Sequence, residues 1–325
     1  MTEELLKVED LSVQYQGLHT ANAVNHISFS IMPHETIGLV GETGAGKTTT
    51  ALSILRLLPQ RTGKITSGHI YYRGKDLLQL SEKEMQAIRG SEISMIFQDP
   101  MTSLNPVLTV GKQIEESFIF HNEAGLTKEE IDGKVDDLLR LVGIEPSRRD
   151  DYPHQFSGGM KQRVVIAMAL ACQPQLLIAD EPTTALDVTI QAQVINMMME
   201  LQKKNQTATI LITHDLGVVA KMCSKVAVIY AGEIVEMGGI RDILSGDWHH
   251  PYLTGLLGSI PSIRKKIERL KPVDGLMPDP SNLPAGCKFH PRCAQCTERC
   301  RTEEPPVYMQ GDHMVKCFAA EVDHG

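Results

Sequence analysis

Hydrophobic positions along the chain follow the spacing of strands and helices in turn. In residues 5–40, apolar and β-branched residues alternate with polar ones, which predicts short strands. Residues 48–58, "TTTALSILRLL", have helical spacing. The apolar runs "QLLIAD" at 175–180 and "ATILITHD" at 208–215 predict buried parallel strands. Apolar strands that alternate with helices indicate an α/β fold with a largely parallel sheet.

The pattern also divides the chain. Residues 111–142 have helical spacing, and a further helix is predicted from Ser157 to about residue 172. After about residue 240 the periodicity fades, while proline, glycine and cysteine become more frequent. We therefore predict a main domain over 1–240 and a C-terminal extension over 241–325.

Composition narrows the classes of function. The chain has 325 residues and a formal net charge of -8, which argues against a general nucleic-acid binder. Its longest apolar runs are about half of a bilayer span, and the N-terminus lacks a signal pattern. We therefore expect a soluble, cytosolic chain, with at most a peripheral role at a membrane.

The stretch "GETGAGKTTT" carries the clearest chemical signal. Gly41, Gly46, Lys47 and Thr48 match the pattern G-x-x-x-x-G-K-[ST], between an apolar strand and a helix. In this pattern backbone N–H groups surround phosphates, lysine reaches the terminal phosphates, and the hydroxyl binds Mg²⁺. The alternative is a glycine turn that binds nothing. The predicted nucleotide contacts are Gly41, Glu42, Thr43, Gly44, Ala45, Gly46, Lys47, Thr48 and Thr49.

Two further stretches carry groups suited to nucleotide chemistry. "LLIADEP" ends a predicted buried strand with Asp180 and Glu181, where one acid can hold Mg²⁺ and the next can polarise an attacking water. In "FSGGMKQR", Ser157 can cap a helix, and two glycines allow close backbone approach. The alternatives are a solvated acid pair and simple helix capping.

Together these motifs resemble the ATP-binding cassette (ABC) ATPases over about residues 5–260. The resemblance also includes Gln98 in "FQDP", "TALD" at 184–187 and His214 in "THD", all in family order. It implies a P-loop ATPase with a RecA-like core, an antiparallel β subdomain and a helical subdomain over about 101–165.

The resemblance also implies roles for single residues. Tyr15 would stack on adenine, with a packed or exposed tyrosine as the alternative. Lys47 would hold the β- and γ-phosphates. Glu181 would be the general base and His214 would contact the γ-phosphate. The residues that would arrange Mg²⁺ and its waters are Thr48, Gln98 and Asp180.

In this family the signature of one cassette caps ATP on the other cassette of a dimer. Ser157, Gly158 and Gly159 would form that signature here, although Phe156 and Met160 replace the usual leucine and glutamine. The chain holds one cassette. The resemblance therefore implies a second cassette, either a different paralogous chain or a second copy.

Five of the seven cysteines fall between residues 287 and 317. Clustered cysteines without a signal peptide suggest a metal site rather than disulfides. Four thiolates can bind Zn²⁺ or an iron–sulfur cluster, and the spacing alone does not decide between them. Free thiols are the third alternative.

The cysteine pattern resembles the C-terminal extension of dipeptide and oligopeptide importer ATPases, which carries a [4Fe–4S] cluster. On that resemblance Cys287, Cys293, Cys300 and Cys317 would be ligands and Cys296 a spare. Two more stretches, 97–111 and 249–261, resemble the same subfamily. The basic stretch "IRKKIERLKP" at 263–272 is interpreted as a solvated helix face, with contact to lipid headgroups as the sharper alternative.

The resulting hypothesis is the ATP-hydrolysing subunit of an ABC importer for di- or oligopeptides. It implies two transmembrane permease subunits, docked near Gln98 and residues 101–150, an extracytoplasmic substrate-binding protein, and a peripheral position on the cytoplasmic face of the cell membrane. The alternative cargoes are nickel, a metallophore or glutathione. A soluble cassette ATPase acting on nucleic acid or ribosomes is the alternative of another class, and the acidic balance opposes it.

Overall fold

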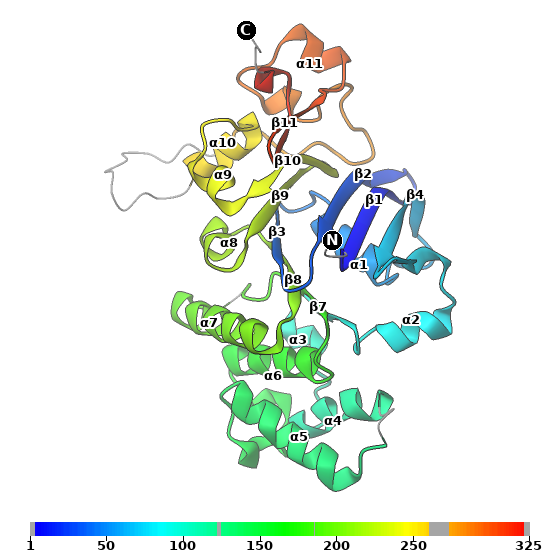
Figure 1. Ribbon diagram of the computed structural model, residues 1–325, viewed down its shortest axis with the longest axis vertical. Coiled ribbons are helices and arrows are strands. Elements are labelled where there is room, and N and C mark those ends of the chain that lie inside the picture. Colours follow the sequence, from blue (N-terminus) through cyan, green and yellow to red (C-terminus); the bar gives the residue numbers. More distant parts are fainter. Residues whose placement is uncertain (1–3, 122–124, 185, 260–272, 322–325) are drawn as a thin grey trace. The chain divides into compact units, whose positions relative to one another are not determined.

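The computed structural model describes residues 4–121, 125–184, 186–259 and 273–321 (Figure 1). The chain forms two compact units. The first unit comprises Ile31–Thr36 and Gln79–Thr213. The second unit comprises Glu4–Ser30, Ile37–Leu78 and the described residues from His214 onwards. The basic stretch at 263–272 lies outside the described residues.

The first unit contains a parallel sheet in the order β6-β7-β8. Its strands are β6 (Ile93–Ile96), β7 (Leu176–Asp180) and β8 (Ala208–Thr213). Every residue of β7 and β8 is buried, which explains why both sequences are apolar throughout rather than alternating. The two buried strands predicted from these runs are therefore confirmed.

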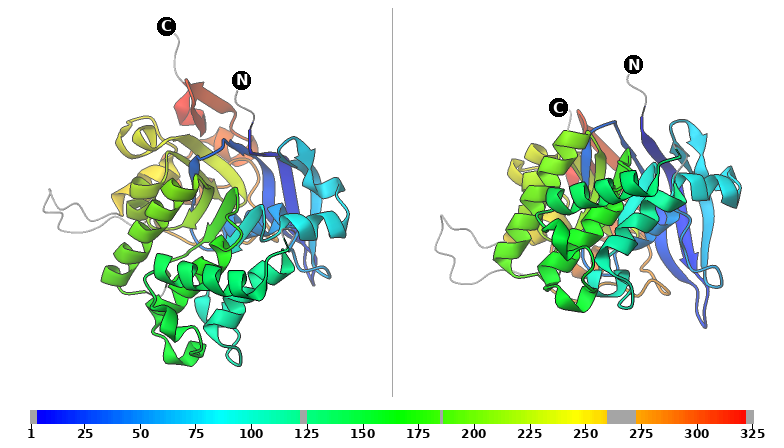
Figure 2. Two further views of the ribbon diagram at one scale, coloured as in Figure 1. Left: turned by 60° about the horizontal axis from the view of Figure 1, so that its bottom comes forward. Right: turned by 90° about the horizontal axis from the view of Figure 1, so that it is seen from below.

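Helices make up the rest of the first unit. Helices α4, α5 and α6 pack against one another, and α6 also contacts α7 and β6 (Figures 1 and 2). Thr127 and Glu130 form a capping box at the start of α5, which satisfies two backbone N–H groups of its first turn. The helices are α2 (Glu82–Ile88), α3 (Pro100–Ser103), α4 (Val110–Phe120), α5 (Lys128–Leu141), α6 (Gly158–Leu170) and α7 (Val188–Asn205).

The second unit begins with an antiparallel sheet in the order β2-β1-β4-β5. In β1 the side chains of Leu6, Val8, Leu11 and Val13 are buried, as the alternating pattern of this segment predicts. These strands are β1 (Leu6–Tyr15), β2 (Ala21–Ile31), β4 (Gly63–Tyr72) and β5 (Lys75–Asp76).

Further strands of the second unit run in the order β3-β9-β10-β12-β11. Strands β3 and β9 are parallel, whereas β9 and β10 form an antiparallel hairpin. Ala231 and Gly232 at its turn both have positive φ, as the tightest hairpin turns require. The strands are β3 (Thr36–Val40), β9 (Lys225–Tyr230), β10 (Glu233–Gly239), β11 (Val307–Gln310) and β12 (His313–Lys316).

Short helices accompany these strands. They are α1 (Lys47–Ile54), α8 (Leu216–Met222), α9 (Ile240–Ser245), α10 (Pro251–Gly258) and α11 (Glu298–Thr302). None of the helices in the described part of the chain is long and apolar enough to cross a membrane.

The C-terminal segment has a small core of its own. Val315, Cys317 and Ala320 are buried there, with Trp248 and Tyr308 packed against them. The Trp248 indole N–H donates a hydrogen bond of 3.1 Å to the carbonyl of Ala320. So little apolar surface contributes little to folding, because that contribution scales with the apolar area buried.

Candidate functional site

The loop Gly41–Gly46 connects β3 to α1 in a conformation that its glycines make possible. A Cβ atom on Gly41 would lie 2.2 Å from the carbonyl oxygen of Ile229, and one on Gly46 would lie 2.4 Å from that of Ala23. Gly44 and Gly46 also have φ values of 84° and 103°, which side chains with a Cβ rarely adopt. Thr43 and Gly44 are exposed, while Ala45 is buried.

The lysine of this loop is held by the loop itself. The Lys47 Nζ atom donates hydrogen bonds to the carbonyls of Gly41 at 2.7 Å and Glu42 at 2.9 Å. Its side chain is thereby curled over the loop, where a phosphate chain would lie. Thr48 is exposed at the first turn of α1, and this helix N-terminus adds a positive dipole end.

Tyr15 lies next to the same helix. Its hydroxyl is 3.3 Å from the Oγ1 atom of Thr49, and its side chain is half-buried. The structure therefore places Tyr15, predicted to stack on the base, beside the helix that follows the phosphate loop. Its ring can serve as a wall for an adenine that extends from phosphates in the loop.

In the first unit, the acidic pair stands at the carboxyl end of β7. Asp180 is 1% exposed. Glu181 has a φ of 46°, a strained conformation of the kind that concentrates at functional sites. Its Oε2 atom accepts hydrogen bonds from Gln98 Nε2 at 3.2 Å and from Thr184 Oγ1 at 2.8 Å. The structure thus brings predicted residues Gln98 and Glu181 together.

The signature segment forms the start of α6, as predicted. Ser157 is the N-cap residue, and its Oγ atom accepts a hydrogen bond from the backbone N–H of Met160. A Cβ on Gly159 would lie 2.4 Å from Cγ2 of Ile190, whereas one on Gly158 would have Leu186 Cδ2 at 3.9 Å as its nearest neighbour. Of these two glycines, packing among the described residues requires only Gly159.

His214 follows β8 and is exposed in the second unit. The next residue, Asp215, caps α8 by accepting hydrogen bonds from the backbone N–H groups of Gly217 and Val218. This cap fixes the backbone beside His214 while leaving its imidazole accessible to solvent.

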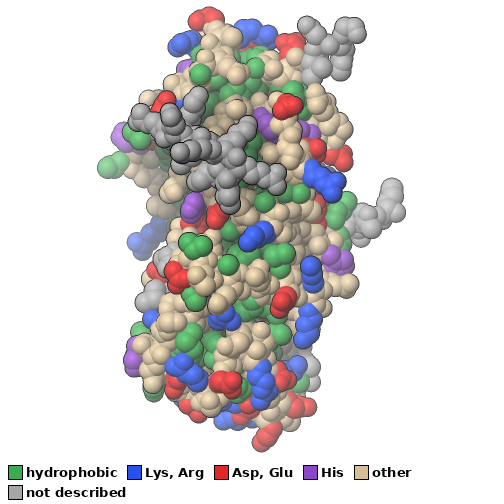
Figure 3. All heavy atoms as spheres, turned by 90° about the vertical axis from the view of Figure 1, so that its left-hand side faces the viewer, with side chains coloured by type: hydrophobic (Ala, Val, Ile, Leu, Met, Phe, Trp, Pro, Cys, Tyr) green, Lys and Arg blue, Asp and Glu red, His purple; other side chains and the backbone are tan. Residues whose placement is uncertain are grey.

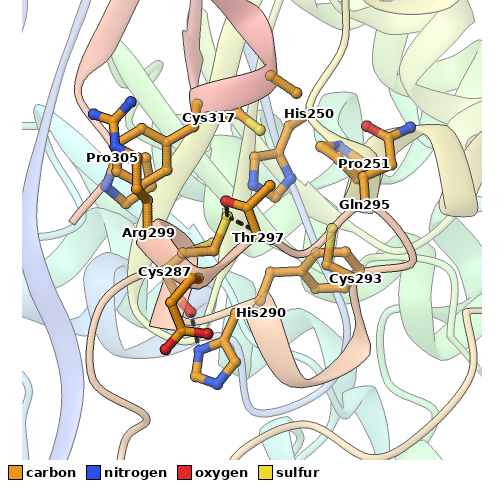
Figure 4. Close-up of a pocket in the computed structure, with 15 residues that line it drawn as sticks. His250, Pro251, Cys287, His290, Cys293, Gln295, Thr297, Arg299, Pro305 and Cys317 are labelled. Atoms are coloured by element: carbon orange, nitrogen blue, oxygen red, sulfur yellow. Dashed lines mark hydrogen bonds between the residues drawn. The ribbon is translucent and has the colours of Figure 1, made fainter. Parts of the chain in front are cut away.

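Four of the five clustered cysteines line one cavity of about 430 Å³ (Figure 4). They are Cys287, Cys293, Cys300 and Cys317, the predicted ligand set. Cys296, predicted to be a spare, is absent from the lining, and its Sγ atom donates to the carbonyl of Thr297. None of the seven cysteines forms a disulfide bond.

Burial shifts the pKa values of four groups that line the cavity. Burial, with smaller contributions from the neighbouring cysteines, raises the pKa of Cys287 to about 11. Burial likewise raises the pKa values of Cys293 and Cys317. Burial lowers the pKa of His250, which also lines the cavity, to about 3. Four thiols in an apolar cavity suit a metal centre, whose positive charge would favour thiolates.

Sequence reasoning missed two residues that hold the phosphate loop. The backbone N–H of Glu42 donates to the Tyr252 hydroxyl at 2.9 Å, and the Glu42 carboxylate forms an ion pair with Arg292. Their only sequence signal is position: Arg292 precedes a clustered cysteine and Tyr252 lies in "HHPY". Contacts between residues more than 200 positions apart cannot be predicted from the periodicity of the sequence.

A glycine-rich phosphate loop before a helix, and an acidic pair after a buried parallel strand, are the features of a P-loop ATPase. The family model described as ABC transporter matches residues 24–184, and that described as the C-terminal region of oligopeptide/dipeptide transporters matches residues 235–300.

Named relatives extend over nearly the whole chain. The dipeptide transport ATP-binding protein DppD of Bacillus subtilis is 48% identical over 97% of this chain and 95% of its own. DppD of Escherichia coli is also 48% identical, over 99% and 98%. The oligopeptide transport ATP-binding protein OppD of Bacillus subtilis is 48% identical over 98% and 90%. The chain therefore belongs to the ABC transporter family and is an ATPase of that family.

Solved structures agree on the fold. A dimeric ATP-binding cassette in a post-hydrolysis state with ADP and Pi matches with a TM-score of 0.66 and 27% identity, over 73% of this chain and 99% of that one. The cassette cbiO1 of Clostridium perfringens matches with a TM-score of 0.64 and 30% identity, over 74% and 90%. The predicted ABC-type α/β fold is thus confirmed.

Proposed function

We propose that this chain is the ATP-hydrolysing subunit of an importer for di- or oligopeptides. The observation that carries the proposal is the near full-length identity of 48% to dipeptide and oligopeptide transport ATP-binding proteins. The match of residues 235–300 to the C-terminal region of such transporters supports it. Cargo selectivity would lie in the partner subunits, and this chain supplies the energy.

In this proposal the second unit binds the nucleotide. The loop Gly41–Gly46 surrounds the phosphates with backbone N–H groups, and Lys47 exchanges its carbonyl partners in the loop for the β- and γ-phosphates. Tyr15 stacks on adenine. His214 contacts the γ-phosphate from its exposed position after β8.

The first unit supplies the hydrolytic groups. Glu181 is the general base that orients and deprotonates water, and its hydrogen bonds to Gln98 and Thr184 hold its carboxylate in place. Of the residues assigned to Mg²⁺, Gln98 and Asp180 lie in this unit and Thr48 lies in the second. The ion would neutralise charge on the phosphates during hydrolysis.

The signature segment acts on a second cassette. Among the described residues, the nearest atom to a Cβ on Gly158 would be Leu186 Cδ2 at 3.9 Å, which is ordinary contact. We infer that the reason for glycine there lies outside this chain. We assign that reason to ATP bound by a partner cassette. The partner is a different paralogous chain in our primary proposal and a second copy in the alternative.

The remaining partners follow from the importer proposal. They are two transmembrane permease subunits, docked near Gln98 and residues 101–150, and an extracytoplasmic substrate-binding protein. The exposed side chains of Val107, Ile119 and Phe120 offer apolar contacts for docking. The chain would then lie peripherally on the cytoplasmic face of the cell membrane. The boundary of its extension near residue 240 belongs to the same proposal.

The cysteine cavity would hold a [4Fe–4S] cluster, with zinc as the alternative. A tetrahedral zinc with Zn–S bonds of about 2.3 Å would place its thiolates about 3.8 Å apart. Cys287, Cys293, Cys300 and Cys317 line one cavity, which supports a single metal centre for all four. The preference for a cluster over zinc rests on the resemblance to the importer ATPases. Either centre would join segments whose own core is small.

The cluster proposal is tested by anaerobic purification and metal analysis. We expect iron and acid-labile sulfide in equal amounts, with a broad visible absorption. Cys317→Ser should lose both, whereas the matched control Cys296→Ser should keep both. Stoichiometric zinc without sulfide would replace the cluster with the zinc alternative.

The competing functions differ in cargo or class. Nickel, metallophore and glutathione importers would use the same ATP chemistry. An ATPase acting on nucleic acid would need a basic surface, whereas acidic and basic side chains are interspersed on the face in Figure 3 and the net charge is -8.

The importer proposal is tested by ATPase activity in lipid. The chain is co-expressed with its partner cassette and permeases, reconstituted, and titrated with the binding protein. Stimulation by peptide-loaded binding protein is the expected result. Stimulation only by a nickel chelate or glutathione would change the cargo. Activity that ignores every cargo, without copurifying permeases, would contradict the importer proposal.

A further inference from the structure

A residue of the C-terminal extension, Arg292, forms a hydrogen-bonded ion pair with Glu42 of the phosphate loop. Both carboxylate oxygens of Glu42 accept hydrogen bonds from the guanidinium of Arg292, from Nη1 at 2.8 Å and from Nη2 at 3.0 Å. The two residues are 250 positions apart. A two-point pair between a planar guanidinium and a carboxylate fixes orientation as well as distance.

Every donor of that guanidinium has a partner. Besides Glu42, Nε donates to the Asp274 carbonyl at 2.8 Å, Nη2 to the Val273 carbonyl at 3.2 Å, and Nη1 to the Tyr230 hydroxyl at 3.4 Å. These bonds use all five N–H groups that an arginine has. The Arg292 side chain is 5% exposed, so its position is fixed by its surroundings.

Arg292 does not line the cysteine cavity, but its backbone is continuous with two residues that do, His290 and Cys293. It ends the 3₁₀ turn His290–Arg292 and directly precedes Cys293. The backbone of this turn is tied to a second cysteine, because the N–H and Nδ1 of His290 lie 3.0 Å from the carbonyl of Cys287. The position of the guanidinium therefore depends on the fold around the cysteines.

Glu42 in turn positions the lysine that reaches for phosphate. Its carbonyl accepts hydrogen bonds from Lys47 Nζ at 2.9 Å and from the backbone N–H of Ala45 at 3.2 Å. Its own N–H is held by the Tyr252 hydroxyl. A residue clamped by the extension at both its side chain and its N–H thus shapes the turn that carries Lys47.

We propose that Arg292 is a positioning residue of the ATP site, through which the cysteine-containing extension sets the affinity of the phosphate loop for ATP. It acts through Glu42 and touches no reacting atom. The inference rests on the proposed role of the loop Gly41–Thr49 in binding ATP. It adds that ATP binding depends on an intact extension.

The test compares Arg292→Ala, Arg292→Lys, Glu42→Gln and the double variant Arg292→Ala/Glu42→Gln in the assembled transporter. We expect the KM for ATP to rise about tenfold in each single variant, because a charge-assisted hydrogen-bond pair is lost. At saturating ATP, kcat should stay near wild type, since the loop binds ground state and transition state alike. The double variant should be no worse than either single variant.

Two controls keep a folding defect apart from a positioning effect. Arg301→Ala removes an arginine of the same extension whose side chain is 58% exposed, and its KM should equal that of wild type. Trp248, the single tryptophan, packs in the core of the extension, so its fluorescence reports whether that core is intact. If Arg292→Ala alters this fluorescence, the KM of Glu42→Gln decides whether the ion pair positions the loop, because that substitution changes only the loop.

Lys47→Ala separates this inference from the proposed function. If Lys47→Ala leaves ATP binding intact, the proposed nucleotide site itself is wrong. If Lys47→Ala abolishes ATP binding but the Arg292 and Glu42 variants bind ATP as wild type does, the positioning role is overturned. Strictly additive effects in the double variant, or a fall in kcat at unchanged KM, would overturn it as well.

Discussion

The phosphate loop and the signature segment both place glycines at the start of a helix. The structural reason why a side chain is excluded differs between the two. In the phosphate loop, the backbone of the same unit excludes a Cβ at Gly41 and at Gly46. In the signature, Ile190 excludes a Cβ at Gly159, whereas the described residues leave room for a Cβ at Gly158, with Leu186 Cδ2 nearest at 3.9 Å. The described residues thus account for Gly41, Gly46 and Gly159, and we propose that a partner cassette accounts for Gly158.

We expect the largest loss of ATP hydrolysis from a substitution of Glu181, which lies in neither of these two segments. Glu181→Gln should lower kcat by roughly 10²-fold or more, because it removes the proposed general base. The phosphate loop is untouched, so ATP binding should persist and hold two cassettes together. Steady-state hydrolysis and ATP-dependent dimerisation, measured on the same preparation, check this. Wild-type turnover in this variant would remove Glu181 from its role.

Gly46→Ala tests the loop that its own chain builds. The Cβ would lie 2.4 Å from the Ala23 carbonyl oxygen at a φ of 103°, so the backbone must move. We expect ATP affinity to fall roughly 10²-fold, since small misplacements of binding groups are that costly. Equilibrium ATP binding measures it, with Gly158→Ala as the matched control that should bind ATP normally.

Gly159→Ala should act on stability. Its Cβ would meet Ile190 Cγ2 at 2.4 Å, and overpacking of this kind costs about 1–3 kcal/mol. Urea unfolding of the chain should show a lower midpoint for Gly159→Ala and an unchanged one for Gly158→Ala. Equal midpoints for the two variants would erase the distinction between these glycines.

Gly44→Ala should have the smallest effect. Nothing lies within 4 Å of the added Cβ, and only the φ of 84° opposes it. A left-handed conformation costs a residue with a Cβ about 1–2 kcal/mol. We expect a small loss of stability with ATP binding retained. A loss of binding as large as that of Gly46→Ala would mean that the loop backbone is not the deciding factor.

The sequence allowed most of the nucleotide site to be predicted because its motifs are local. Lys47 and Asp180 are each recognised from the few residues around them, and the apolar strands before them are continuous in sequence. The cysteines were recognised by their density. The ion pair between Arg292 and Glu42 was not predicted, because a single contact between distant segments leaves no pattern in the sequence. The hairpin of β11 and β12 was not predicted, because each strand is only four residues long and shows too little alternation.

We propose that Gly158 contacts a nucleotide bound to another cassette. The most direct measurement compares ATP binding and ATP-dependent dimerisation of Glu181→Gln with and without Gly158→Glu, together with the partner cassette. We predict the same ATP affinity for the phosphate loop in both forms, and loss of dimerisation only in the form that carries Gly158→Glu. Dimerisation that survives this change, or ATP binding that is lost with it, would contradict the claim.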